Sequence, residues 1–222
     1  MRTLSKSKLI AYRQCTKRLW LEIHRPELRA DSAATLASFA TGHQVGDIAR
    51  QIYDPKLKGT LIKIEADGFE AAFVQTKQLI SQAKPLFEAG FRAGGALAFA
   101  DVMLPPQKPH GTEPGTWIEV KSSSSVKDYH RDDAAIQAFV AREAKVNLTR
   151  IALAHIDTKW RYPGRQEYSG LLVENDLTDE AFARHDEVRE WIARAQVVAT
   201  KRKEPAVSTG AHCSTPFECG FL

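Results

Sequence analysis

The centre of the chain changes from helical to strand periodicity, and this change constrains the fold more than any other feature. Strands are predicted where apolar segments of strand length are bounded by glycine or proline, and Gly94-Gly95 separates the first two. The predicted strands are residues 86–92, 95–104, 116–121 and 150–157, with a loop at 105–115 and a helix over 127–146. Three strands, a helix and a further strand predict an α/β fold with a central mixed sheet flanked by helices.

The remainder of the chain has a mainly helical pattern. Apolar residues recur three and four positions apart, and a serine precedes each of the first two such segments. The further helices predicted are residues 5–24, 32–53, 69–83 and 178–200, with short strands near 60–65 and 169–174. A chain of 222 residues fits one large domain, which we expect to span residues 1–222.

Positive charge is concentrated near the start of the sequence. Residues 1–29 carry eight Lys or Arg and two Glu, a net charge of +6, so the rest nets −2 within the total of +4. This asymmetry favours contact with a phosphate backbone, and a solvated helix face is the alternative. No segment has the ~18 consecutive apolar residues of a membrane span, and no secretory signal is recognisable. We therefore expect a cytoplasmic protein with no membrane partner.

Asp101, Glu119 and Lys121 are candidates for a catalytic site. Asp101 lies near the end of its predicted strand, and Glu119 and Lys121 share one face of the next. If the two strands are antiparallel neighbours, their carboxylates converge and provide the oxygen ligands that Mg²⁺ and Mn²⁺ prefer. The lysine would then stabilise negative charge during phosphodiester hydrolysis. The alternative is a surface ion pair on a strand end.

The segments ADVML (100–104) and WIEVKSSSSVKDYHRDDAAIQ (117–137) resemble the core of the PD-(D/E)XK nucleases. They are most similar to the RecB-like branch that includes the Cas-four-type exonucleases, and within it to a bacterial group with an EVKSS-SVKDYH run. The resemblance implies a restriction-endonuclease-like core over residues 60–175. Asp101, Glu119 and Lys121 match the catalytic motif, and Gln137 matches the glutamine that orders the site.

The resemblance also implies further metal ligands. Glu88 matches an acidic position that often contributes to metal binding, with a strand-surface acid as the alternative. The branch commonly carries a metal-binding histidine at the position of Gly46, and His43 is a nearby substitute whose alternative is a helix-surface residue. Ala141 stands where a tyrosine often follows the glutamine by one turn.

Cys15, Cys213 and Cys219 are too few for a disulfide framework, so they are either metal ligands or inert thiols. YRQCTKRLWLE and HCSTPFECGFL resemble the terminal segments that ligate a [4Fe–4S] cluster in Cas-four-type and AddB-like nucleases. The resemblance implies that residues 1–31 and 205–222 meet at a cysteine metal site, with a fourth cysteine expected a few residues after Cys219. Either the chain is a shortened form whose cluster cannot assemble fully, or His212 completes a Cys₃His site that equally suits Zn²⁺, or the thiols bind no metal.

These patterns predict a Mg²⁺- or Mn²⁺-dependent DNA nuclease that acts on ends or single strands in repair, CRISPR adaptation or phage defence. Its partners would be DNA and a protein of a repair or CRISPR complex. Cations expected to contact the DNA are Arg13, Lys17, Arg18, Lys127 and Arg131. Two alternatives stay open: a catalytically inactive nucleic-acid-binding module of the same fold, and an iron–sulfur or zinc protein that senses redox state.

Overall fold

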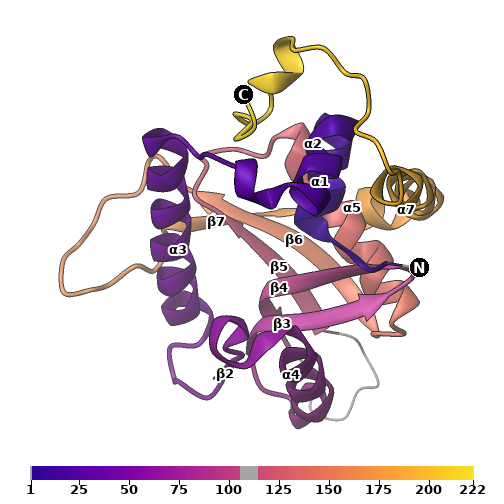
Figure 1. Ribbon diagram of the computed structural model, residues 1–222. Coiled ribbons are helices and arrows are strands. Elements are labelled where there is room, and N and C mark those ends of the chain that lie inside the picture. The colour runs from indigo at the N-terminus through magenta and orange to yellow at the C-terminus, as the bar shows by residue number, and fades with distance from the viewer. Residues whose placement is uncertain (1, 106–114) are drawn as a thin grey trace.

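The computed structural model describes residues 2–105 and 115–222, and its centre is a mixed seven-stranded sheet (Figure 1). The strands are β1 (Leu4–Ser5), β2 (Thr60–Leu61), β3 (Leu86–Ala93), β4 (Ala96–Leu104), β5 (Gly115–Lys121), β6 (Leu148–Ile156) and β7 (Leu172–Asp176). Their order is β2-β3-β4-β5-β6-β7, and β1 pairs with β4. This confirms the predicted α/β class with a mixed sheet. Residues 106–114, most of the predicted loop at 105–115, lie outside the described residues.

Strand directions agree with the connections between the strands. β3, β4 and β5 follow one another as antiparallel neighbours, whereas β5 and β6 are parallel because a helix connects them. The α-helices are α1 (Lys6–Gln14), α2 (Thr16–His24), α3 (Ala33–Tyr53), α4 (Ile64–Leu79), α5 (Asp128–Glu143), α6 (Thr178–Ala183) and α7 (His185–Ala199). Short 3₁₀ helices are formed by Pro26–Leu28, Ile80–Gln82 and Ala211–Cys213.

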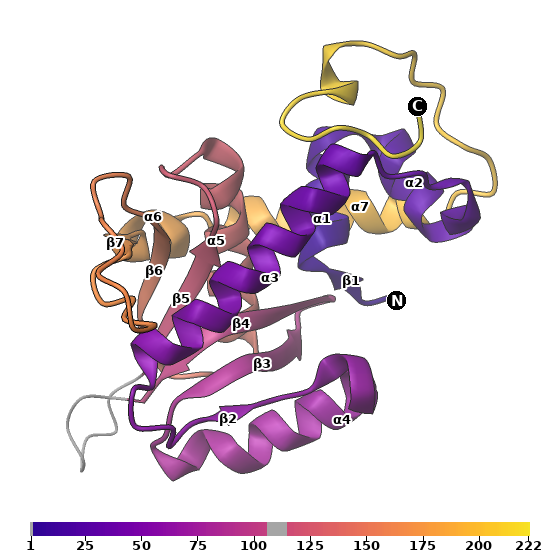
Figure 2. The same ribbon diagram turned by 90° about the vertical axis from the view of Figure 1, so that its left-hand side faces the viewer.

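The sheet is covered on both faces. Trp117 of β5 packs into the larger core with Phe139 of α5, and its neighbour Ile118 packs into a smaller core with Ala49 of α3. Side chains of successive strand residues alternate between faces, so α5 and α3 lie on opposite sides of β5. Figure 2 shows α3 lying across the strands.

Several predicted elements are corrected by the structure. The single helix predicted over 5–24 is two helices, because Cys15 has an extended backbone with φ −163° and ψ 127°. The helix predicted over 178–200 likewise breaks between α6 and α7 at Arg184. The strand near 60–65 is limited to Thr60–Leu61, since α4 begins at Ile64. Helical periodicity alone did not reveal these breaks because the apolar stripe continues across them.

The two ends of the described chain lie side by side. Gln14 Nε2 donates hydrogen bonds to the carbonyl oxygens of His212 (2.6 Å) and Phe217 (2.7 Å), and Ala30 N donates to Gly220 O (2.7 Å). Both views show the C-terminal segment beside α1 and α2 (Figures 1 and 2). None of the helices in the described parts of the chain has the length and apolarity needed to cross a membrane.

Candidate metal and catalytic site

Glu88 and Asp101 lie opposite each other on β3 and β4. The register pairs Phe87 with Val102. Glu88, which follows Phe87 on β3, therefore lies opposite Asp101, which precedes Val102 on the antiparallel strand β4. Glu88 has φ +57° inside a strand, a left-handed conformation that is rare for any residue with a side chain. Such a conformation costs on the order of 1 kcal/mol and is found most often at functional sites.

Glu119 continues this row on β5. Pairing between β4 and β5 ends at Val102 and Ile118, and the next residues in the same register are Asp101 and Glu119. At this point the ladder opens, and Asp101 Oδ2 accepts a hydrogen bond from Val120 N (2.7 Å). Three carboxylates therefore lie side by side on three adjacent strands. The sequence predicted this proximity for Asp101 and Glu119.

Glu119 is the centre of a polar network contributed by strand and helix residues. Lys121 Nζ donates to Glu119 Oε1 and to Asp133 Oδ2, each at 2.7 Å. Lys6 of α1 donates to the same oxygen of Glu119, and Gln137 of α5 donates to the other. Glu119 and Gln137 are almost completely buried, so this network holds the carboxylate in one orientation.

The three carboxylates differ in electrostatic environment. Burial favours the neutral form of Glu119, but Lys121 and Lys6 outweigh it and hold the pKa of Glu119 well below its usual range. Burial, followed by the charge of Glu119, raises the pKa of Asp101 to about 8. The same two causes raise the pKa of Glu88. At neutral pH the row therefore carries less negative charge than three fully ionised carboxylates would. A cation that binds there would compete with the proton on Asp101.

Lys121 and His130 differ in charge at neutral pH. Burial disfavours the ammonium form of Lys121, but Asp133 and Glu119 reverse this and raise the pKa of Lys121 well above its usual range. Burial, assisted by the charge of Lys121, lowers the pKa of His130 to about 4. His130 Nδ1 accepts a hydrogen bond from Lys127 N (3.2 Å), which caps the start of α5. Lys121 is thus a cation at neutral pH, and His130 is a neutral structural residue.

The network opens onto a cleft of about 780 Å³ beside α3. Its lining includes Glu88, Asp101, Glu119, Lys121 and, on α3, Gly42, His43 and Gly46. His43 is exposed, and it acts on the row only electrostatically among the described contacts: burial raises the pKa of Glu88, and the charge of His43 is one of those that oppose this shift. A Cβ added to Gly46 would meet nothing within 4 Å. The structure therefore brings together Glu88, Asp101, Glu119, Lys121 and Gln137, while His43 stands at the cleft wall.

The donor atoms of the carboxylate row are of the kind that binds a divalent cation. Glu88, Asp101 and Glu119 supply only oxygen atoms, which suits Mg²⁺ or Mn²⁺. Gln137 Oε1 is buried and has no hydrogen-bond partner among the described residues. Within residues 2–105 and 115–222, however, no three His, Cys, Asp or Glu side chains form a group that could hold a metal as it stands. The donor types fit, and the ammonium groups on Glu119 would have to move.

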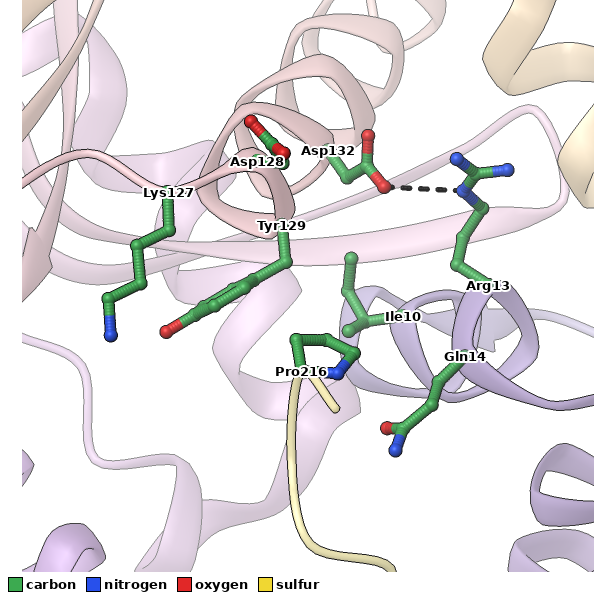
Figure 3. A pocket seen from close by; sticks show the side chains of 8 residues that line it. All are labelled: Ile10, Arg13, Gln14, Lys127, Asp128, Tyr129, Asp132 and Pro216. Atoms are coloured by element: carbon green, nitrogen blue, oxygen red, sulfur yellow. Dashed lines mark hydrogen bonds and ion pairs between the residues drawn. The ribbon is translucent and has the colours of Figure 1, made fainter. Parts of the chain in front are cut away.

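Most of the cations predicted to contact DNA have partners within the chain. The pairs are Arg13 with Asp132, Lys17 with Glu204, Arg18 with Glu22, and Arg131 with Glu180. Figure 3 shows the pair of Arg13 and Asp132 at a second cavity of about 360 Å³, which Lys127, Tyr129 and Pro216 also line. Lys127 is exposed. The pairs of Arg13, Lys17 and Arg131 are partly exposed and therefore weak and salt-dependent, whereas the side chains of Arg18 and Glu22 are only 13% and 11% exposed. Phosphate binding by four of the five predicted cations would compete with these pairs.

The cysteines are close to the junction of the chain ends but do not form a metal site in the described structure. Cys213 and Cys219 lie on the segment that Gln14 holds, and a hydrogen bond joins Cys219 N to Cys213 O (2.8 Å). All three cysteines are half-buried free thiols. The described residues contain no group of three Cys, His, Asp or Glu side chains around them. The meeting of the two ends agrees with the prediction, and metal binding there stays a prediction.

Two residues of the network were not assigned to the site from the sequence. Asp133 lies four positions before Gln137, on the same face of α5, so helical spacing from Gln137 was a usable signal. Lys6 was counted only as one basic residue among eight near the N-terminus. Its contact with Glu119 depends on the packing of α1 against α5, which no local pattern reports.

Comparison with known proteins adds little to this geometry. No protein-family model matches the chain, and no curated protein matches its sequence. Among solved structures, the one titled "Crystal structure of SSO0001" aligns with a TM-score of 0.42 and 16% sequence identity, covering 92% of this chain and 79% of that chain. A similarity of this size carries no argument about function. The site is therefore interpreted from its own residues.

Proposed function

We propose that this chain is a metal-dependent DNA nuclease of the RecB-like branch of the PD-(D/E)XK superfamily, with a restriction-endonuclease-like core. The observation that carries the proposal is the row of Glu88, Asp101 and Glu119 across three adjacent strands, with Lys121 bonded to the last of them. A surface ion pair would not require the buried Glu119 to have half-buried carboxylates beside it on the two neighbouring strands. The mixed sheet flanked by helices is compatible with this core.

Each side chain has a role in the proposed reaction. Glu88, Asp101 and Glu119 would hold Mg²⁺ or Mn²⁺, which supplies Lewis acidity and lowers the pKa of a bound water. Gln137 orients Glu119 through Oε2, whereas Lys6 donates to Oε1 in this structure and would have to release that oxygen to the cation. Because the shape of the carboxylate row is set by strand register, it is preorganised before substrate binds.

Lys121 acts as an electrostatic residue in this proposal and does not accept a proton. Its raised pKa, caused by Asp133 and Glu119 against the effect of burial, keeps it charged at neutral pH. Hydrolysis places an additional negative charge on the phosphoryl oxygens as water attacks phosphorus and the sugar oxygen leaves. An ammonium group facing the cleft stabilises that charge in the transition state.

The test is cleavage of 5′-labelled single-stranded DNA by the purified chain with Mn²⁺ or Mg²⁺. We expect products with metal, none with a chelator, and a loss of at least about 100-fold in Asp101→Asn. Asn can still accept the hydrogen bond from Val120, so this variant should fold. Equal cleavage by the wild type and Asp101→Asn would reject the proposal.

One observation favours a second function, a nucleic-acid-binding module without catalysis. Both oxygens of Glu119 accept hydrogen bonds from Lys6, Lys121 and Gln137, so the chain itself neutralises the carboxylate. Under this alternative the ammonium groups would take the place of the cation. Binding of DNA without cleavage at any Mn²⁺ concentration would select it.

We also propose that the junction of the chain ends binds a metal through Cys15, Cys213 and Cys219, as an iron–sulfur cluster or a zinc site with His212. The support is that Gln14, next to Cys15, holds the backbone on either side of Cys213. Metal analysis after anaerobic purification should find iron or zinc, lost in Cys15→Ala. A protein without either metal would reject this proposal and leave the nuclease proposal intact.

A further inference from the structure

The loop between β6 and β7 carries an aromatic cluster that the proposed catalytic site does not use. Residues 157–170 contain Trp160, Tyr162 and Tyr168, and all three rings contact one another. Tyr162 and Tyr168 are stacked with ring centroids 5.6 Å apart, and Trp160 and Tyr168 are stacked at 6.3 Å. Tyr162 is 54% exposed, so the cluster presents an aromatic surface to solvent.

The cluster is preorganised by hydrogen bonds within the loop. Trp160 Nε1 donates to Ser169 O (2.8 Å), and Gln166 N donates to Tyr162 Oη (2.9 Å). Asp157 N donates to Leu171 O (2.8 Å), which closes the base of the loop. A ligand that stacks on these rings would therefore lose little free energy to ordering of the protein.

The same loop carries three cations. Lys159, Arg161 and Arg165 are exposed, and none of them has a carboxylate within ion-pair distance among the described residues. The loop's two acids are engaged by its backbone: Asp157 accepts from Lys159 N, and Glu167 accepts from Ser169 N. The loop thus has a net charge of +1, and its three cations are exposed in the same segment as the rings. Arg161 Nη1 also donates to the carbonyl oxygens of Thr158 (3.3 Å) and Trp160 (3.1 Å).

The loop leaves the sheet next to the catalytic cleft. His155 of β6 pairs with Lys121 of β5, and Ile156 N donates to Ser123 O (2.9 Å). Ser122, the neighbour of Ser123, lines the cleft. Figure 1 shows the loop projecting past α3 from the ends of β6 and β7. A DNA strand that leaves the cleft at Ser122 would pass the start of this loop.

We propose that the loop 157–170 is a platform for single-stranded DNA, on which bases stack on Tyr162 while Lys159, Arg161 and Arg165 bind phosphates. The proposal rests on the proposed nuclease function, whose substrate it narrows to a single strand. Exposed rings with flanking cations are the pattern by which proteins bind single strands without sequence preference. Paired bases within a duplex present no free face to such rings, and a purely apolar partner would not require the three cations.

The experiment measures the binding of a fluorescein-labelled oligothymidylate in EDTA, so that cleavage is not required. Tyr162→Ala should raise the Kd about tenfold, and Tyr162→Phe, which keeps the ring and loses the bond from Gln166, should bind like the wild type. Val197→Ala removes an apolar side chain on α7 that is 62% exposed, against 54% for Tyr162, and should change nothing. Arg161→Gln should reduce the slope of log K against log salt by about 0.7.

The outcomes separate this proposal from the nuclease proposal. An unchanged Kd in Tyr162→Ala overturns the platform, as does an equal loss in Tyr162→Phe, since the effect would then come from loop structure. An equal loss on a duplex of the same sequence also overturns it. Binding that depends on Tyr162 without Mn²⁺-dependent cleavage keeps the platform and rejects the nuclease, whereas cleavage with unchanged binding does the reverse.

Discussion

The carboxylate row and the junction of the chain ends are both candidate metal sites, and they are built differently. Glu88, Asp101 and Glu119 stand on paired strands, so backbone hydrogen bonds set the positions of their Cα atoms. Cys213 and Cys219 lie on a segment of irregular structure that Gln14 holds by two hydrogen bonds. A ladder positions residues far apart in sequence with little freedom, whereas an irregular segment depends on a few side-chain contacts.

Two lysines that contact Glu119, one on a strand of the ladder and one on a helix near the N-terminus, allow the test with the largest expected effect. Lys121 lies on β5 and Lys6 on α1, and both donate to Glu119 Oε1. We expect Lys121→Met to lower kcat about 100- to 1,000-fold because the charge facing the phosphate is lost. Lys6→Met should lower kcat less than about tenfold, since Lys121 and Gln137 still hold Glu119. Equal losses in single-turnover cleavage would mean that both lysines serve the reaction.

The raised pKa of Asp101 predicts a pH-dependent metal affinity. Burial and the charge of Glu119 raise this pKa to about 8, so below pH 8 a cation must displace a proton. Affinity for Mn²⁺ should therefore rise about tenfold per pH unit from pH 6 and level off above 8. In the metal-free protein the same group contributes stability at low pH that is lost as pH rises through 8, because the folded state binds the proton more tightly.

Calorimetric titration with Mn²⁺ from pH 6 to 9 measures this dependence. Asp101→Asn is the control, and its affinity should be low and nearly flat with pH. A wild-type affinity that does not change between pH 6 and 8 would mean that the carboxylate row carries its full charge without metal.

Gly46 tests whether the cleft accepts a further ligand from a helix. A side chain at Gly46 or Gly42 meets no atom within 4 Å of its Cβ, and both positions line the cleft. The family resemblance places the metal-binding histidine at Gly46, so Gly46→His should raise Mn²⁺ affinity about tenfold at pH 8. Gly42→His is matched in helix propensity and should change it little. Equal gains in the two variants would assign the effect to added charge or stability.

Substitution of Glu88 has the smallest expected effect, and it tests whether the backbone at this residue is strained. Its φ of +57° is unstrained only for glycine. Glu88→Gly should therefore have a free energy of unfolding about 1 kcal/mol higher than Glu88→Ala, while both lose activity. Denaturant unfolding measures the difference. A Glu88→Gly protein no more stable than Glu88→Ala would show that the backbone relaxes once the carboxylate is removed.

The sequence by itself determined the elements whose signal is local. Glycine and proline bounded β3, β4 and β5, and serines marked the starts of α1 and α3. Two-residue alternation placed Glu119 and Lys121 on one face of their strand. The proximity of Asp101 to Glu119 was expected on the condition that the two strands joined by the loop at 105–115 are antiparallel neighbours, which they are.

Only the tertiary structure decided the contacts that link distant elements. Lys6 reaches Glu119 across 113 positions of sequence, and the rings at 160, 162 and 168 gather because their loop closes on itself. Arg13, Lys17 and Arg131 have carboxylate partners on distant segments, whereas Arg18 pairs with Glu22 one turn along its own helix. The reason is that periodicity encodes which face a side chain occupies, while the residue that it meets there depends on how whole elements pack.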